Sequence, residues 1–417
     1  MSKLIIKGPA RLEGKVKISG AKNAALAVIV AALLGEGETV LENVPQIGDV
    51  LIMTEILDTL GVKVHWPGSD TLRLTVPEGI GHLADYNMVK RLRASNLLLG
   101  ALLARKGIAE ISLPGGCQIG SRPMDLHIKG LTQLGCRISI EHGFIKASRS
   151  HMHGARIYLD FPSVGATENI MIAATMAEGQ TVLENAAKEP EVVDLASFLN
   201  SMGARIRGAG TDVIKIDGVK HLYGTRYSII PDRIEAGTFM VGAAITGGSI
   251  MVENVILTHL KPIIAKLKET GAYIEETDSG IFVAGPEFIR SVDVKTLPYP
   301  GFPTDMQSQM MALLSLARGT SLITENVFEN RLQLGIELKR MGAKVKVEGR
   351  TAIVQGVEKL CGASVKALDL RSGAALVLAG LAAVGISEIQ QLEVIDRGYR
   401  HMEAKLRSLG ADVRRVN

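Results

Sequence analysis

The sequence predicts an α/β protein built from six copies of one βαβαββ-like repeat, with buried helices inside and sheets around them. The first observation is a helix-ending glycine, which follows an apolar helical pattern in six places roughly 70 residues apart. Such a glycine caps the helix, and the alternating residues after it are typical of a strand. These glycines are Gly61, Gly135, Gly203, Gly271, Gly342 and Gly410.

The second observation is an anchor glycine in each repeat, which stands between a small-residue apolar helix and a β-rich run. The helical patterns cover residues such as 24–34, 239–245 and 374–384, and they are apolar on most sides. Helices of that kind are buried, so we expect them inside and the sheets outside. The anchors are Gly37, Gly107, Gly179, Gly248, Gly319 and Gly385.

The third observation is that the sixth repeat is one strand short. Its last strand pattern ends near Val413, whereas residues 4–6 form a strand pattern without a repeat of their own. We therefore expect this N-terminal strand to complete the sixth repeat. The chain then divides into a first lobe of three repeats, residues 20–231, and a second lobe of three repeats, residues 1–19 with 232–417, which holds both termini.

Composition narrows the class of protein. The 417 residues are 47% apolar and carry a formal net charge of +4 that is spread thinly, so nucleic acid is not expected as a partner. Three cysteines argue against a disulfide framework and for a reducing compartment. Without a signal-peptide core or an apolar run of bilayer length, the chain is expected to be cytoplasmic, with no membrane partner.

Cofactors and metals find no support in the motifs. No phosphate-binding loop or dinucleotide fingerprint follows a strand pattern. His151 and His153 are two loop histidines without a third ligand, which favours a solvated loop over a metal site. We therefore expect no cofactor and no metal.

Residues 113–127 depart most from the repeat. The second repeat is longer than the others between its two glycines, and the extra length falls in this stretch. Three glycines surround Cys117, and Arg122 follows, an arrangement that exposes a thiol and favours its thiolate. The arginine would also suit a carboxylate or a phosphate. The alternative interpretation is a surface loop with an incidental cysteine.

Charged and polar residues stand at the starts of the buried helices. Helix N-termini carry partial positive charge, so a basic residue there costs stability unless an anion binds. Capping does not explain Lys22, Arg93 and Arg371, and there we expect an anion site. Plain N-capping remains open for Ser163, Asp232 and Asp305.

Two further arginines, Arg331 and Arg397, lie in matching loops of the fifth and sixth repeats. Together with the cations at helix starts, they would come from both lobes. Such a set of cations predicts a cleft for a polyanionic substrate.

Six stretches carry motifs that are specific in combination, and they are residues 20–25, 113–117, 120–127, 231–235, 302–307 and 396–399. Together they resemble the bacterial UDP-N-acetylglucosamine enolpyruvyl transferases, over essentially the whole length of the chain. The resemblance implies a fold of two inside-out α/β barrels, which agrees with the six repeats. It also implies transfer of the enolpyruvyl group of phosphoenolpyruvate to the 3′-hydroxyl of UDP-N-acetylglucosamine, with release of phosphate, as the first committed step of peptidoglycan synthesis.

The resemblance assigns roles in catalysis and in binding phosphoenolpyruvate. Asp305 would be the general base for the sugar hydroxyl. Cys117 would donate a proton to the methylene carbon, and its thiolate can also form a covalent adduct with phosphoenolpyruvate. The family's phosphoenolpyruvate-binding residues would be Lys22, Asn23, Arg122 and Arg397, of which Lys22 and Arg397 also count as catalytic.

The UDP-sugar site is implied in the same way. Arg331 and Arg371 would complete a cationic wall beside it. The sequence departs from many relatives after Arg331, at Leu332, Gln333 and Leu334, which puts the positioning of that loop in doubt rather than the activity. The sugar-binding residues would be Asn23, Arg93, Arg122, Pro123, Met124, Asp125, Leu126, Ser163, Val164, Gly165, Asp305 and Val327.

Two alternatives remain open. The related transferase of the shikimate pathway shares the six-repeat architecture, although it normally lacks this cysteine loop. A non-catalytic repeat scaffold would explain the periodicity, but it would leave the cations at helix starts unexplained.

Overall fold

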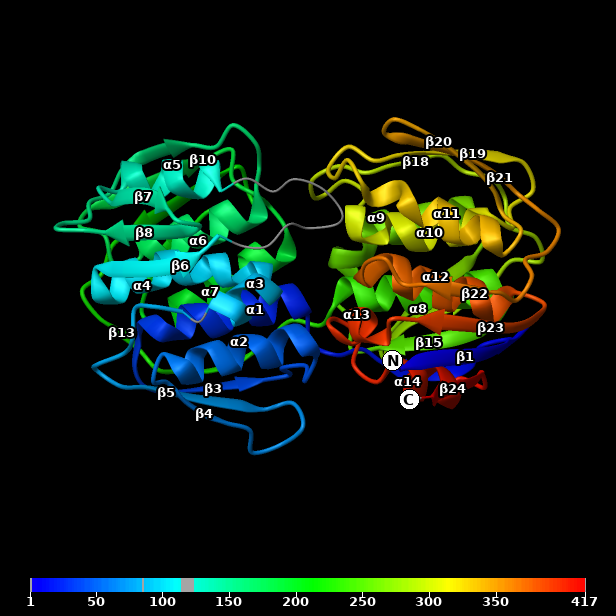
Figure 1. The fold of residues 1–417 in the computed structure, drawn as a ribbon, viewed down its shortest axis with the longest axis horizontal. Helices are drawn as coiled ribbons and strands as arrows, with labels where there is room; N and C mark the ends of the chain where they lie inside the picture. Colours follow the sequence, from blue (N-terminus) through cyan, green and yellow to red (C-terminus); the bar gives the residue numbers. More distant parts are fainter. Residues whose placement is uncertain (1, 85, 114–123, 417) are drawn as a thin grey trace. The chain divides into compact units, whose positions relative to one another are not determined.

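The computed structural model describes residues 2–84, 86–113 and 124–416 of the chain. The chain forms two compact units, and each is described by itself (Figure 1). The first unit holds the described residues between 20 and 230, and the second holds residues 2–19 and 231–416. Each unit has a hydrophobic core of its own.

Three sheets surround the first unit in its described residues, one for each repeat. The strands β13 and β14 from the end of this unit pair in parallel with β3, so they supply the first strand of the first repeat. In the second repeat a single parallel bridge, Leu83 to Glu110, takes that place. In hydrogen-bonded order the sheets are β13 (Leu222–Tyr223), β3 (Gly35–Glu42), β5 (Leu72–Val76) and β4 (Lys63–His65), with β14 (Arg226–Ser228) also on β3; β6 (Ile108–Ser112), β8 (Phe144–Ser148) and β7 (Arg137–Glu141); and β11 (Arg205–Arg207), β12 (Val213–Asp217), β10 (Gln180–Glu184) and β9 (Arg156–Tyr158).

One helix of each repeat in this unit is enclosed. Residues 24–31 of α1, 98–104 of α4 and 166–174 of α6 are buried without a break, as their alanine-rich patterns predict. The other helices cover the outside with one apolar face. The helices are α1 (Lys22–Ala31), η1 (Ala32–Leu34), α2 (Gly48–Thr59), α3 (Tyr86–Arg91), η2 (Arg93–Leu97), α4 (Leu98–Lys106), α5 (Asp125–Gln133), α6 (Val164–Ala174) and α7 (Pro190–Ser201).

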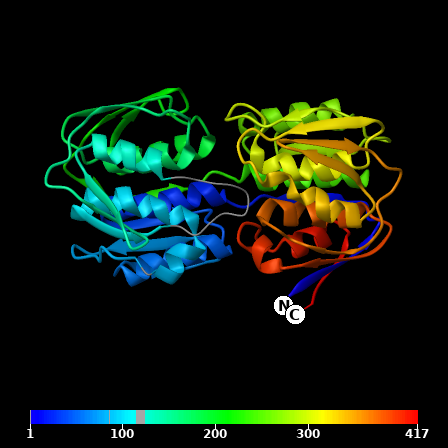
Figure 2. The same cartoon turned by 45° about the horizontal axis from the view of Figure 1, so that its top comes forward.

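The second unit repeats this plan with strands drawn from both ends of the chain. β2 pairs in parallel with β15 and so begins the fourth repeat. β1 lies between β23 and β24 and completes the sixth repeat, and the two views show the N and C marks close together (Figures 1 and 2). The sheets are β2 (Glu13–Lys17), β15 (Ser249–Glu253), β17 (Gly280–Ala284) and β16 (Tyr273–Thr277); β18 (Val294–Lys295), β19 (Thr320–Thr324), β21 (Thr351–Gln355) and β20 (Lys344–Glu348); and β22 (Ser364–Lys366), β23 (Gly385–Gln390), β1 (Lys3–Gly8) and β24 (Asp412–Val416).

The enclosed helices of the second unit are α8, α10 and α12, which lie among the strands of its sheets (Figure 1). Residues 234–245, 307–314 and 371–381 of these helices are all buried. The helices are α8 (Arg233–Thr246), α9 (Leu257–Glu269), η3 (Thr304–Met306), α10 (Gln307–Leu314), η4 (Arg331–Gln333), α11 (Leu334–Arg340), α12 (Leu370–Ala382), α13 (Leu392–Asp396) and α14 (Met402–Ser408).

Glycine is required at the six helix-ending positions because of the backbone conformation there. All six have φ between 91° and 109°, a region that side-chain-bearing residues rarely adopt. The predicted architecture of repeats with buried helices inside sheets is therefore confirmed. The sheets stay separate, and in the part of the chain that the structure describes none of them closes into a continuous barrel.

A Glu-Asn pair ends the second strand in four repeats. The asparagine Nδ2 donates to a carbonyl oxygen just after the first strand of the same sheet in each case. The bonds run from Asn43 to Ile229, from Asn185 to Leu159, from Asn254 to Ile18 and from Asn326 to Thr296.

Candidate active-site residues

Lys22 begins α1 and forms an ion pair with a residue that the sequence did not single out. Its Nζ lies 3.1 Å from Oδ2 of Asp49, and the two side chains are 14% and 3% exposed. Ala21, which precedes the helix, offers no side-chain cap, so the cation stands at an uncapped helix start. Asp49 was missed because an acidic residue in the first turn of a helix is usually explained by the helix dipole alone. Asn23 is exposed.

Three predicted sugar-site segments gather around His127 in the first unit. The charges of Arg93 in η2 and Asp125 at the start of α5 both act on the His127 ring. A Cβ atom on Gly165 would lie 3.3 Å from Cε1 of the same ring, so α6 approaches it closely there. Ser163 caps α6 by accepting a hydrogen bond from the Ala166 amide, and this confirms capping at that position.

Burial and a hydrogen-bond network set the protonation state and the tautomer of His127. Burial, together with the charge of Arg93, lowers the pKa of His127 to about 4, against the opposing charge of Asp125. Asn169 donates from Nδ2 to Nδ1 of His127 (2.9 Å), which places the ring proton of the neutral histidine on Nε2. Asn169 also accepts from the Gly100 amide (2.8 Å) and donates to the Asn96 carbonyl oxygen. The sequence signal for His127 was only its place at the end of a motif.

In the second unit the structure brings Asp305, Arg331 and Arg371 together. Oδ1 of Asp305 lies 2.8 Å from Nη2 of Arg331, and Oδ2 accepts hydrogen bonds from Nε and Nη2 of Arg371 at 3.0 and 2.8 Å. Both arginines are buried. Asp305 lies within η3 and does not cap a helix with its side chain, so capping is not its role.

The two guanidinium groups are held in a buried environment but are not fully satisfied. Burial lowers the pKa of Arg371, yet the charge of Asp305, aided by Tyr399 and Asp232, outweighs burial and raises that pKa above its ordinary value. Nε of Arg331 and Nη1 of Arg371 are buried and have no acceptor among the described residues. Buried donors of this kind fit a bound anion.

Tyr399 connects the Arg397 segment to this cluster. Its hydroxyl group is 2.9 Å from Oγ1 of Thr238 in α8, and Arg371 lies over its ring at 5.5 Å. Arg397 directly follows α13 and is half-buried. Arg415 binds both carboxylate oxygens of the neighbouring Asp396, at 2.9 and 2.7 Å, and so ties this segment to β24. Sequence reasoning did not single out Arg415.

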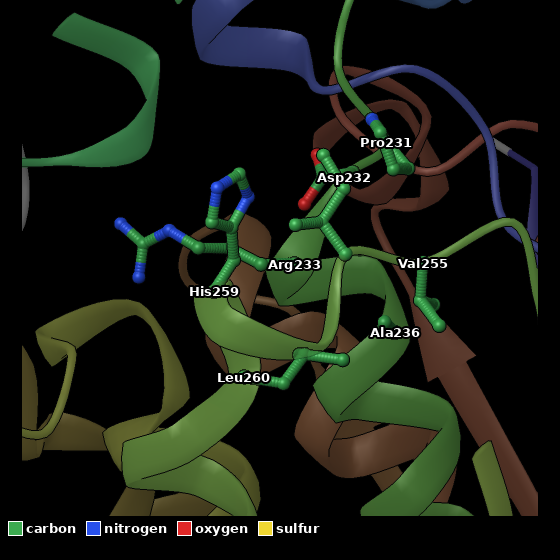
Figure 3. Close-up of a pocket in the computed structure, with 8 residues that line it drawn as sticks. Pro231, Asp232, Arg233, Ala236, Val255, His259 and Leu260 are labelled. Atoms are coloured by element: carbon green, nitrogen blue, oxygen red, sulfur yellow. The ribbon is translucent and has the colours of Figure 1, made fainter. Parts of the chain in front are cut away.

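Asp232 caps α8, the interpretation that the sequence left open for it. Its Oδ1 accepts from the amides of Ile234 and Glu235 at the start of α8. Figure 3 shows Asp232 there, with Arg233 and His259 extending toward the same side. The hollow beside them holds about 160 Å³ of empty space that includes open solvent, and it encloses no cavity of ligand size.

The remaining predicted site residues are only partly described. Cys117, Arg122 and Pro123 lie outside the described residues. Met124 is buried, whereas Leu126, Val164 and Val327 are half-buried. No group of His, Cys, Asp and Glu side chains within residues 2–84, 86–113 and 124–416 could hold a metal ion. No described helix is long and apolar enough to span a bilayer.

Residues 6–406 match the model of a family described as EPSP synthase (3-phosphoshikimate 1-carboxyvinyltransferase), and the chain belongs to this enolpyruvyl transferase family. Solved structures agree with this fold. The enolpyruvyl transferase NikO from Streptomyces tendae superposes with a TM-score of 0.90 at 25% identity over 100% of this chain and 99% of that one. EPSP synthase from Acinetobacter baumannii does so with a TM-score of 0.79 at 22% identity over the full length of both chains.

Curated relatives are more similar in sequence, and they share one name, UDP-N-acetylglucosamine 1-carboxyvinyltransferase. The relative numbered 2 from Carboxydothermus hydrogenoformans is 56% identical over 100% of both chains. The relative numbered 1 from Caldanaerobacter subterraneus subsp. tengcongensis is 55% identical over 99% of both chains. The relative from Halothermothrix orenii is 52% identical over 100% of both chains.

Proposed function

We propose that this protein is a UDP-N-acetylglucosamine 1-carboxyvinyltransferase. It transfers the enolpyruvyl group of phosphoenolpyruvate to the 3′-hydroxyl of UDP-N-acetylglucosamine and releases phosphate, the first committed step of peptidoglycan synthesis. The observation that carries this proposal is identity of 52–56%, over almost the whole chain, to relatives that share this one name.

Cations are proposed to hold phosphoenolpyruvate. Lys22, Arg122 and Arg397, with Asn23, would bind its phosphate and carboxylate groups. Negative charge moves toward the departing phosphate as the tetrahedral intermediate forms and collapses, so fixed cations lower the barrier. The buried ion pair that fixes Lys22 at the start of α1 supports this role. Arg331 and Arg371, with their unpartnered buried N–H groups, would add to the cationic wall.

Asp305 is proposed to be the base. It would take the proton of the sugar hydroxyl as that oxygen attacks C2 of phosphoenolpyruvate, while Cys117 donates a proton to C3. Loss of phosphate and of one proton from C3 then restores the double bond. Two arginines bound to the Asp305 carboxylate favour its ionised form, which is the form a base requires.

The UDP-sugar is proposed to bind through the residues around His127. Arg93, Asp125 and the start of α6 approach this ring, and the helix start at Ser163–Gly165 presents backbone N–H groups suited to a diphosphate. The other residues proposed for this sugar site are Asn23, Arg122, Pro123, Met124, Leu126, Asp305 and Val327. Both substrates are small molecules, and we place the reaction in the cytoplasm.

Phosphate release with two acceptors tests the function. The purified protein should release phosphate from phosphoenolpyruvate when UDP-N-acetylglucosamine is added, and not when shikimate 3-phosphate is added. Activity with shikimate 3-phosphate alone would assign the protein to the other branch of the family. No release with either acceptor would support a non-catalytic role.

A further inference from the structure

The fifth repeat departs from its counterparts at the Glu-Asn pair that ends the second strand. In three repeats the glutamate lies at the surface and pairs with a cation from the first strand of its sheet. These pairs are Glu42 with Arg226, Glu184 with Arg156 and Glu253 with Lys15. In the fifth repeat, Glu325 is fully buried instead.

Glu325 is buried among hydrogen-bond donors. Oε1 accepts from Oγ1 of Thr296 (2.8 Å) and from the amides of Val327 and Phe328 (2.8 and 3.0 Å). Oε2 accepts from Oγ1 of Thr304 (2.9 Å). All four of these partners donate to the carboxyl group, so both of its oxygens are hydrogen-bonded inside the fold.

The counterparts of Thr296 are all aliphatic. Asn326 donates to the Thr296 carbonyl oxygen, and the equivalent asparagines of the other repeats donate to Ile229, Leu159 and Ile18. The fifth repeat therefore differs at two positions. Thr296, just after the first strand, carries a hydroxyl group, and Glu325, just after the second strand, has a carboxylate that faces inward. In a repeat protein the shared positions serve packing, so a paired departure of this kind points to a task specific to this repeat.

The hydrogen bonds lead from Glu325 to Asp305. The Thr304 hydroxyl gives its one proton to Glu325, so its oxygen is free to accept from Nη1 of Arg331 (2.9 Å). Nη2 of Arg331 then lies 2.8 Å from Oδ1 of Asp305. Phe328, whose amide Glu325 also holds, places its ring 5.4 Å from the Arg331 guanidinium.

We propose that Glu325 is a positioning residue, which orients the Arg331 guanidinium through Thr304 and thereby fixes Asp305 for proton transfer. The inference rests on the proposed role of Asp305 as base. Glu325 touches neither substrate in this account. It acts because a base must stand within hydrogen-bonding reach of the proton it removes, and a displacement of about 1 Å can cost about 10²-fold in rate.

The test uses variants of Thr304, because loss of the buried Glu325 charge can prevent folding. Thr304→Val keeps the side-chain shape but breaks the connection between Glu325 and Arg331. Thr304→Ser restores the hydroxyl group. Thr296→Val is the matched control, since it also removes one hydrogen bond from Glu325 but leaves the path to Arg331 intact.

We expect kcat to fall about 10-fold or more in Thr304→Val, with the KM for phosphoenolpyruvate changed less, and to recover in Thr304→Ser. Thr296→Val should keep kcat. Equal losses in Thr304→Val and Thr296→Val, or no rescue by serine, would overturn the proposal.

A second readout separates this proposal from the proposed function. Crystal structures of the wild-type protein and of Thr304→Val do not depend on which substrate is used. We expect the Arg331 guanidinium to leave Oδ1 of Asp305 in the variant, and an unmoved guanidinium would refute the relay. If wild-type protein released no phosphate with UDP-N-acetylglucosamine, the proposed function would fail, and the crystal structures would still decide whether Glu325 positions Arg331.

Discussion

Asp305 carries the proposed chemistry at the scale of single residues. Asp305→Asn keeps the shape of the side chain but cannot take up the hydroxyl proton, so we expect kcat to fall by about 10² or more. Asp369→Asn is the control, because asparagine also caps helices well and Asp369 caps α12 two residues before Arg371. Steady-state phosphate release measures both variants. Near-normal turnover of Asp305→Asn would remove this residue from the role of base.

The three cysteines should differ in reactivity. Burial raises the pKa of Cys136 to about 11, against the charge of Arg149, and its sulfur packs against that of Met152. Cys361 is exposed. Fosfomycin, an epoxide that bears a phosphonate, needs a thiolate and cations that hold the phosphonate, so we expect it to alkylate Cys117 alone.

Peptide mass mapping after fosfomycin treatment checks this expectation. Alkylation should be faster with UDP-N-acetylglucosamine present and slower when Lys22 or Arg397 is replaced. Cys117→Asp should retain some turnover, since aspartic acid can still donate a proton, and it should resist the inhibitor. Labelling of Cys361 at the same rate as Cys117 would argue against a special environment for Cys117.

Asp194 gives the first unit a pH-dependent stability. Burial raises its pKa to about 6, although the hydrogen bond from Tyr227 (2.6 Å) opposes the rise. In the unfolded chain the pKa of Asp194 is near 3.8, so as pH falls the carboxylate takes up a proton in the folded state before it does so in the unfolded state. The folded state is therefore destabilised by the buried charge above about pH 6, and this destabilisation disappears between about pH 6 and 4.

We therefore expect the unfolding free energy of Asp194→Asn, relative to that of wild type, to be highest at pH 8. This difference should fall by about 1–3 kcal/mol by pH 4, because wild type gains stability when Asp194 takes up its proton. Tyr227→Phe removes the opposing hydrogen bond and should move the transition in wild-type stability to higher pH. Urea unfolding across this pH range measures both effects. A difference between Asp194→Asn and wild type that is independent of pH would contradict the assignment.

At the scale of elements, the contact between α4 and α6 depends on Gly100. A Cβ atom there would lie 2.4 Å from both the carbonyl oxygen and Oδ1 of Asn169, the residue that also holds His127. Gly100→Ala must push the two buried helices apart, and we expect the free energy of unfolding to fall by about 2–4 kcal/mol. Gly68→Ala, in open space, should change it by less than about 0.5 kcal/mol. Denaturant midpoints of the two variants provide the comparison.

The repeats could be predicted because their signals are local. A glycine with positive φ after an apolar helix leaves the same mark in sequence six times, and buried helices are visible from their alanine-rich composition. The cations at helix starts were found for the same reason. Asp49, His127 and Glu325 could not be found in this way, because their roles depend on partners distant in sequence.

Glu325 shows why such residues stay hidden. Its sequence context, a glutamate before an asparagine at the end of a strand, is the same as that of Glu42, Glu184 and Glu253. Only the folded chain distinguishes a carboxylate that faces inward from three that face solvent. The separation of the described strands into six open sheets also depends on pairing between distant strands, which no local pattern contains.

At the scale of the whole molecule, the two units differ in how they use the chain. All strands that pair within the first unit lie between residues 20 and 230, whereas the second unit needs β1 and β2 from residues 3–17. We expect a fragment of residues 20–230 to fold alone, and a fragment of residues 231–417 to fold only when residues 1–19 are joined to it. Circular dichroism and thermal melting of the three fragments test this, and a cooperatively folded 231–417 fragment would contradict it.

The place of β1 between β23 and β24 also determines when this unit can form in a cell. Residues 3–8 are synthesised before the strands on either side of them, which end at residues 390 and 416. At roughly 5–20 residues per second, synthesis of the intervening chain takes on the order of a minute. During that time the synthesis of residues 20–230 is completed and they can fold. The apolar side chains of Leu4 and Ile6 stay unpacked, because β23 and β24 have not yet been synthesised. A nascent chain of this protein is therefore expected to carry a folded first unit while residues 3–8 are still unpaired. Chaperones that bind exposed apolar segments would be expected to bind these residues.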